Sequence, residues 1–158
     1  KRSSLITLIF LVSLISDQIT KVIARKVLAA SYYTYWGDTV RFGLAENSGA
    51  FLSIGSSLSD TARFMIFTVG IGLLMLGGVV LLYIKKNLDR LLTIAYSLIL
   101  SGGIGNLIDR GMKSTVTDFM NVGIGPVRTG VFNIADMAIM AGVGMLFYQN
   151  FKESKKSK

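Results

Sequence analysis

The stretch from Val131 to Phe151 reads VFNIADMAIMAGVGMLFYQNF, a long apolar run that carries one carboxylate, Asp136, near its start. A second aspartate, Asp118, lies shortly before the run. Placing a carboxylate near hydrocarbon is costly unless the group is paired or used, so ionisable residues at a membrane are candidates for function. The stretch therefore indicates a membrane helix with two acids at its entrance that could act together.

The composition indicates a membrane protein. Of the 158 residues, 51% are hydrophobic and only 16% are charged, and the mean hydropathy of +0.56 is too high for an ordinary soluble domain. A helix needs about 20 apolar residues to cross about 30 Å of hydrocarbon. We therefore predict one all-α domain over residues 1–158, with four transmembrane helices at residues 5–24, 64–84, 91–108 and 131–151.

The basic residues predict the orientation. The net charge is +8, and in membrane proteins Lys and Arg gather on the cytoplasmic side. They are densest before the first segment, in the short second connection and after the last segment: Lys1, Arg2, Lys85, Lys86, Arg90, Lys152, Lys155, Lys156 and Lys158. We expect both termini in the cytoplasm and the two longer loops outside, and we expect no nucleic acid partner.

The first segment has a second interpretation. A basic start, an apolar run and small residues after Leu28 also describe a cleavable signal peptide. Asp17 and Lys21 interrupt the run before any cleavage site, which favours a membrane helix. The chain has no cysteine and no histidine, so disulfides, cysteine nucleophiles and most metal sites are excluded.

The two longer loops carry strand and turn signals. An aromatic cluster at residues 32–36 is of the kind enriched at lipid headgroups. Residues 39–45 alternate between apolar and polar as strands do, and the second loop contains Gly125 and Pro126 among several turn residues. We predict a small extracytoplasmic β-sheet or hairpin region over the outer face of the membrane.

With this topology, the unusual polar residues fall on one side of the membrane. They come from segments that are distant in the chain: Asp17, Lys21, Glu46, Asn47, Asn106, Asp109, Arg110, Asp118, Asn133 and Asp136. Random placement would scatter them between both faces. We therefore predict a polar site near the outer leaflet.

Local spacings refine this prediction. Asp17 and Lys21 are four apart on a helix and can form a structural pair. Asn133 and Asp136 are three apart, so the amide can hold whatever the carboxylate acts on, or it can cap the helix. Arg110 follows Asp109 at a helix end, where it can cap carbonyl groups or anchor at the headgroups.

Two carboxylates held close together cannot both ionise, so the pair keeps one proton and titrates as a unit. The ionised member can take a proton from water while the other hydrogen-bonds a carbonyl, as in aspartic peptidases. Three alternatives remain: a small transporter or proton-coupled channel that relays ions through Asp17, Lys21, Asp118 and Asp136, a structural membrane adaptor, and a Ser/Lys peptidase that uses Lys21. Clustered acids favour the peptidase, because a relay should distribute ionisable groups through the bilayer.

Five motifs together resemble one known family. They are DQITK at residues 17–21, ENSGA at 46–50, GGIGNLIDR at 102–110, VTDF at 116–119 and FNIAD at 132–136. In this order they resemble the prolipoprotein signal peptidases, also called signal peptidase II, which are bacterial membrane aspartic peptidases. The resemblance covers essentially the whole chain. One departure concerns the first loop, where the family commonly has a second Ala followed by Phe and this chain has Phe51 and Leu52; it bears on substrate preference.

The resemblance implies a specific activity. It implies cleavage of the signal peptide from a lipoprotein precursor, just before a cysteine that carries diacylglycerol, with Asp118 and Asp136 as the catalytic pair. The supporting or substrate-binding positions that it implies are Asp17, Lys21, Asn47, Gly49, Asn106, Arg110 and Asn133. It also implies the bacterial cytoplasmic (inner) membrane, no metal or organic cofactor, and lipid-modified prolipoproteins and membrane lipids as partners of a monomer.

Overall fold

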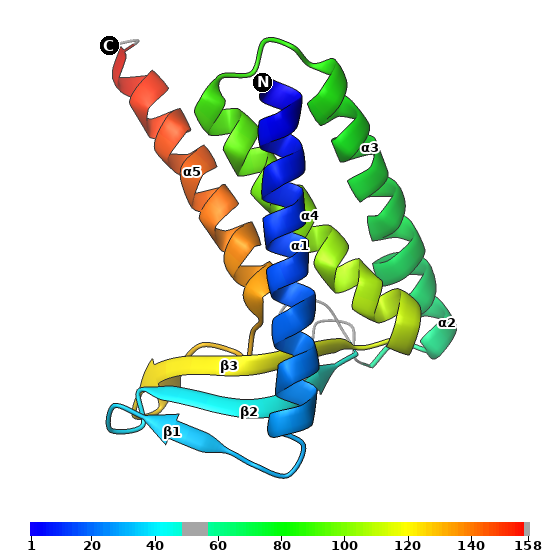
Figure 1. Ribbon diagram of the computed structural model, residues 1–158, viewed down its shortest axis with the longest axis vertical. Coiled ribbons are helices and arrows are strands. Elements are labelled where there is room, and N and C mark those ends of the chain that lie inside the picture. Colours follow the sequence, from blue (N-terminus) through cyan, green and yellow to red (C-terminus); the bar gives the residue numbers. More distant parts are fainter. Residues whose placement is uncertain (49–56, 157–158) are drawn as a thin grey trace.

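Helices make up most of the structure. The computed structural model describes residues 1–48 and 57–156. The long helices run alongside one another, and both chain termini lie at the same end of the bundle (Figure 1). The helical elements are α1 (Arg2–Val27), α2 (Asp60–Arg63), the π-helix η2 (Phe64–Gly70), α3 (Ile71–Ile84), α4 (Arg90–Lys113) and α5 (Ile134–Lys156).

An antiparallel sheet of four strands lies across the opposite end of the bundle (Figure 1). The turn between the first two strands is tight, because Trp36, Gly37 and Asp38 all have left-handed backbone, with φ of 53°, 59° and 71°. The second turn uses a left-handed Gly125, a conformation that glycine adopts without steric cost. The small sheet predicted from the loops is therefore confirmed. Its order is β1 (Tyr33–Tyr35), β2 (Val40–Asn47), β3 (Val116–Ile124) and β4 (Val127–Arg128).

Helix α4 is central, since it packs against α1, α3 and α5. Glycines allow this close approach. A Cβ on Gly102 would lie 2.4 Å from the carbonyl oxygen of Ala135, and one on Gly142 would lie 2.5 Å from that of Ala95. Small residues commonly let membrane helices approach in this way. The contact at Gly102 brings α4 against the first turn of α5.

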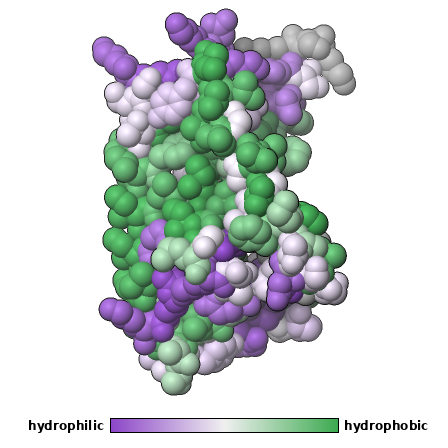
Figure 2. Space-filling model, turned by 90° about the vertical axis from the view of Figure 1, so that its right-hand side faces the viewer, coloured by the Kyte–Doolittle hydropathy of each residue, from purple (hydrophilic) through white to green (hydrophobic). Residues whose placement is uncertain are grey.

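Three helical spans among the described residues are long and apolar enough to cross a membrane: α1, the continuous helix from Asp60 to Ile84, and α4. Helix α5 does not meet that criterion, because Asp136 lies in its first turn and polar residues from Gln149 onward shorten its apolar part. The fourth transmembrane helix, at residues 131–151, thus stays a prediction. On the face shown in Figure 2, hydrophobic side chains cover the middle of the molecule and hydrophilic side chains gather toward both ends.

The helix boundaries differ from the predictions. The helix predicted at residues 91–108 continues to Lys113, because Asp109 is buried inside the fold with partners from other elements and does not end the helix. The helix predicted at residues 64–84 begins at Asp60 and contains the π-helical stretch Phe64–Gly70. The apolar run gives no signal that separates a π-helix from an α-helix. Such stretches are frequent at functional sites.

Candidate active site

Asp118 and Asp136 come together through Asn133. Asp118 lies on β3 and is buried, while Asp136 lies in the first turn of α5. Asn133 Nδ2 donates to Asp118 Oδ1 at 2.7 Å, and the backbone N–H of Asn133 donates to Asp136 Oδ2 at 3.1 Å. In return, Asn133 Oδ1 accepts from the Asp136 backbone N–H at 2.9 Å. This reciprocal arrangement caps α5, so Asn133 both caps the helix and holds the acids.

Two further amides hold the acids from other elements. Asn106 on α4 donates from Nδ2 to Asp136 Oδ1 at 2.9 Å, and Asn47 on β2 donates from Nδ2 to Asp118 Oδ2 at 3.2 Å. The orientation of the Asn106 amide is fixed, because its Oδ1 accepts from Lys21 Nζ at 3.0 Å and a lysine ammonium can only donate. Every carboxylate oxygen of the pair therefore accepts a hydrogen bond.

A buried ion cluster supports this network. Lys21 is fully buried, and its Nζ lies 2.8 Å from Asp17 Oδ2 and 3.0 Å from Asp109 Oδ2. The pairing of Asp17 with Lys21 that their spacing predicts is therefore present. Asp17 Oδ1 also accepts from the Ala135 backbone N–H at 2.9 Å, which ties α1 to the start of α5.

The sequence predicts Asp109 at a helix end beside Arg110, but Asp109 lies inside α4 and contacts the buried Lys21. Its Oδ2 accepts from the Thr117 backbone N–H at 3.1 Å in addition to binding Lys21. Thr117, which no sequence pattern indicates as a site residue, is fully buried next to Asp118. The contact of Asp109 with Lys21 joins two helices that are far apart in the chain, and its contact with Thr117 joins α4 to β3 eight residues later, so no helical or strand spacing indicates either contact.

Arg110 lies on the same side of α4 as the acids and interacts electrostatically with both Asp118 and Asp136. It also lines a cavity of about 210 Å³, together with Ser48, Asp60, Arg63, Phe64, Phe67, Thr68 and Ser114. The cavity therefore joins the π-helix η2 to the polar site. Gly49, and Phe51 at the family departure, lie outside the described residues.

The environment of Asp118 changes its protonation. Burial raises its pKa to about 6, and the nearby negative charge of Asp136 acts in the same direction. The hydrogen bonds from Asn47 and Asn133 and the charge of Lys21 partly oppose this rise. A carboxyl group with such a pKa can hold a proton close to neutral pH, which acid/base chemistry by a pair of aspartates requires.

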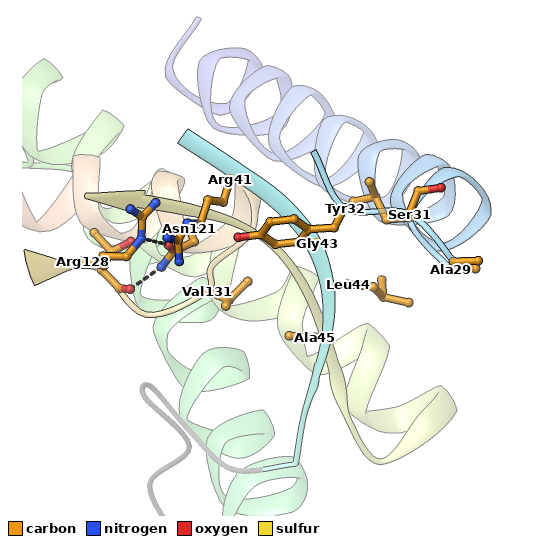
Figure 3. A pocket seen from close by; sticks show the side chains of 13 residues that line it. Ala29, Ser31, Tyr32, Arg41, Gly43, Leu44, Ala45, Asn121, Arg128 and Val131 are labelled. Atoms are coloured by element: carbon orange, nitrogen blue, oxygen red, sulfur yellow. Dashed lines mark hydrogen bonds between the residues drawn. The ribbon is translucent and has the colours of Figure 1, made fainter. Parts of the chain in front are cut away.

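A larger cavity, of about 770 Å³, lies apart from these groups. Its lining comes from the end of α1, the strands and the segment before α5, and includes none of the predicted site residues (Figure 3). The guanidinium of Arg41 binds the Asp38 carboxylate, and that of Arg128 binds Asn121 and the carbonyl oxygens of Asp38 and Thr39. These cations are engaged within the fold, so the acid pair is the stronger candidate site.

The residue types at the site limit its chemistry. Among residues 1–48 and 57–156, no three His, Cys, Asp or Glu side chains are grouped so that they could hold a metal ion. The site combines two carboxylates with amide donors and two cations, Lys21 and Arg110. Such groups can hold, donate and accept protons at a bound amide bond.

The fold and site define a helical membrane protein in which a carboxylate pair lies where the small sheet meets the helix ends. Two solved structures described as bacterial membrane enzymes share this fold. One has a TM-score of 0.81 and 25% identity, covering 98% of this chain and 92% of its own. The other has a TM-score of 0.79 and 26% identity, covering 94% of both chains.

The chain belongs to the signal peptidase II family, because the family model described as "Signal peptidase (SPase) II" matches residues 9–152. The "Lipoprotein signal peptidase" of Psychromonas ingrahamii is 34% identical over 148 residues, which cover 90% of this chain and 83% of the relative. That of Thermodesulfovibrio yellowstonii is 32% identical over 145 residues, which cover 92% of both. The resemblance seen in the sequence is confirmed, and the protein is a membrane protease of lipoprotein processing.

Proposed function

We propose that this protein is an aspartic endopeptidase that removes the signal peptide from diacylglyceryl-modified prolipoproteins, just before the lipidated cysteine. The observation that carries the proposal is the shared network in which Asn133 contacts both Asp118 and Asp136. A pair of carboxylates held by common donors, one of them with a raised pKa, has the groups that peptide hydrolysis by activated water requires.

In the proposed reaction, Asp136 takes a proton from the attacking water while protonated Asp118 hydrogen-bonds the scissile carbonyl oxygen. The water oxygen bonds to the carbonyl carbon, and the carbonyl electrons move to the oxygen. When the intermediate collapses, the C–N bond breaks and the leaving cysteine nitrogen takes the proton from Asp136. General acid and base catalysis each contribute about 10² to 10⁴-fold in rate.

The other predicted positions have supporting roles in this proposal. Asn47, Asn106 and Asn133 orient the carboxylates, and Asp17 and Lys21 hold Asn106 and the start of α5. Arg110 lies at the cavity beside η2 and provides positive charge next to the acids. Gly49 stays in the proposal on its motif alone.

The proposed location is the bacterial inner membrane, with both termini in the cytoplasm, the active site near the outer face, and the protein a monomer. Two observations support this orientation. The termini lie at the end of the bundle opposite the sheet (Figure 1), and the sequence concentrates Lys and Arg at the termini and in the connection after α3. A site at the sheet end would meet a cysteine whose acyl chains remain in the outer leaflet.

Cleavage by purified protein in detergent or lipid tests the proposal. A precursor with a diacylglyceryl cysteine should be cleaved far faster than the same precursor with an unmodified cysteine, because the acyl chains supply binding energy and fix the register. Chelators and serine-protease reagents should have little effect on the rate. Equal rates on both precursors would contradict the assignment of lipid-modified prolipoproteins as the substrate, but they would not contradict peptidase activity.

A further inference from the structure

Thr117, the residue before Asp118 on β3, is a junction between four elements. It is completely buried. Its backbone N–H donates to Asp109 Oδ2 on α4 at 3.1 Å, and its carbonyl oxygen accepts from Asn133 Nδ2 at 3.4 Å. Its hydroxyl contacts Arg25 on α1 and Glu46 on β2. Every polar atom of Thr117 is therefore used, each by a different segment of the chain.

The hydroxyl contacts have a fixed direction. Arg25 Nη1 lies 3.0 Å from Thr117 Oγ1, and Thr117 Oγ1 lies 3.1 Å from Glu46 Oε1. An arginine can only donate and an ionised glutamate can only accept, so the hydroxyl receives from Arg25 and donates to Glu46. We call this chain of Arg25, Thr117 and Glu46 the threonine relay. Charged ends make its hydrogen bonds stronger than neutral ones.

The register of the sheet reinforces the threonine relay. Glu46 lies directly opposite Thr117 where β2 and β3 pair. Its second oxygen, Oε2, accepts from Thr115 Oγ1 at 2.6 Å, so Thr117 on β3 and Thr115, just before β3, hold one carboxylate through their hydroxyls. The relay therefore binds one face of β3 to the neighbouring strand and to the end of α1.

Asp118 occupies the other face of the same strand, because successive side chains of a strand point to opposite faces. Pinning Thr117 at one face limits the rotation of β3 about its own axis. The Asp118 carboxylate moves with that rotation, and so does its distance from Asp136. A misplacement of about 1 Å can lower a catalytic rate about 10²-fold. Holding β3 in place should therefore affect the rate of cleavage.

We propose that Thr117 is a positioning residue for the acid pair, held by Arg25 and Glu46, and that the threonine relay sets Asp118 against Asp136. The inference rests on the proposed function, since it assumes that Asp118 acts in cleavage. Thr117 itself contacts no reacting atom. Its effect should therefore be seen in turnover and not in substrate affinity.

Thr117→Val tests this, because it replaces the hydroxyl by a methyl of nearly the same size. With the diacylglyceryl precursor, kcat should fall about 10 to 10²-fold, while KM should stay within about twofold, since substrate contacts are untouched. Thr117→Ser retains the hydroxyl and should keep kcat within about threefold of wild type. A loss of packing alone would give the opposite pattern, because Ser loses the threonine methyl whereas Val retains it.

Thr93→Val is a matched control. Thr93 is also buried on α4 but lies toward the opposite end of the bundle, where its hydroxyl accepts from Arg2 Nε at 3.4 Å and donates to the Asp89 carbonyl oxygen at 2.8 Å. Both variants lose a buried threonine hydroxyl that accepts from an arginine, but the Thr93 hydroxyl donates to a backbone carbonyl oxygen and the Thr117 hydroxyl donates to a carboxylate. We expect a loss of Tm in both variants, and wild-type kcat only for Thr93→Val.

Glu46→Gln provides a second variant if Thr117→Val does not fold. It removes the charge of the acceptor and should lower kcat several-fold at constant KM. The double variant with Thr117→Val should have nearly the same kcat as Thr117→Val alone, because both substitutions break the same relay. Wild-type kcat in either single variant, or an equal fall of kcat in Thr93→Val, overturns the threonine relay. Asp118→Asn is measured in parallel. Turnover in Asp118→Asn would contradict the proposed function. An inactive Asp118→Asn together with a fully active Thr117→Val would contradict only the threonine relay.

Discussion

An aspartate and an asparagine have almost the same size, but only the aspartate can titrate. Asp118→Asn and Asp136→Asn should therefore each abolish cleavage in a protein that still folds and enters the membrane. Each loss should reach about 10² to 10⁴-fold. Because residues that act as one unit lose activity non-additively, the double variant should be scarcely worse than either single one. Turnover of the lipidated precursor by purified variants measures this.

Asp38→Asn is the control for this pair of substitutions. Asp38 is also a carboxylate, in the turn between β1 and β2, but it is 45% exposed and pairs with Arg41. Its replacement should leave cleavage at the wild-type rate. A folded Asp118→Asn or Asp136→Asn variant that keeps more than about a tenth of wild-type turnover has lost less than acid/base catalysis supplies. Such a result would show that the aspartate concerned is not catalytic.

The pKa of about 6 at Asp118 gives the pH dependence a sign. In the folded protein this carboxyl group retains its proton at a pH where an ordinary aspartate has lost it. If Asp118 holds the proton of the pair, kcat/KM should fall as the pH rises through about 6, because the proton donor is lost. A rise of kcat/KM through the same range would make Asp118 the base and Asp136 the acid.

At the scale of elements, Lys21 stabilises the packing of α1, α4 and α5. Lys21→Ala would leave Asp17 and Asp109 buried beside each other without their cation, a change that typically costs about 3 to 5 kcal/mol. It would also release Asn106, which orients Asp136. We expect a large fall in Tm and a fall in turnover. Thermal unfolding in detergent, with kcat normalised to folded protein, measures both.

Asp17→Asn is the milder change at the same junction. The amide oxygen can still accept from the Ala135 backbone N–H, and Lys21 keeps Asp109 as its counter-charge. We expect lower stability with partial turnover. Normal stability combined with almost no turnover would instead move Asp17 into the catalytic set.

Local patterns predicted the elements, but they did not predict how the elements meet. The pairing of Asp17 with Lys21 follows from one helical turn, and the two hairpins follow from turn residues beside alternating segments. The contacts of Lys21 with Asp109 and of Arg25 with Thr117 depend on helix packing across the whole chain. The extension of α4 past Ile108 follows from the same packing, because burial provides Asp109 with partners inside the fold.

At the scale of the molecule, orientation is the property to test. The chain has no native cysteine, so single introduced cysteines can be labelled without background. Ile124, the last residue of β3, is 80% exposed at the sheet end, whereas exposed Lys86 lies in the connection after α3. A membrane-impermeant maleimide should label Ile124→Cys in intact spheroplasts, and Lys86→Cys only after lysis. The reverse pattern would place the acid pair on the cytoplasmic side.

The buried ion cluster also has a consequence during synthesis. At about 5 to 20 residues per second, the ribosome adds Asp109 roughly 4 to 18 s after Lys21. Throughout that interval, α1 enters the bilayer with Asp17 as the nearby counter-charge of Lys21. Asp17 lies one helical turn from Lys21. Asp17→Asn should therefore reduce the protease-protected fraction of nascent chains stalled at Ile84, before α4 exists. Equal protection of wild-type and variant chains would limit the role of Asp17 to the finished fold.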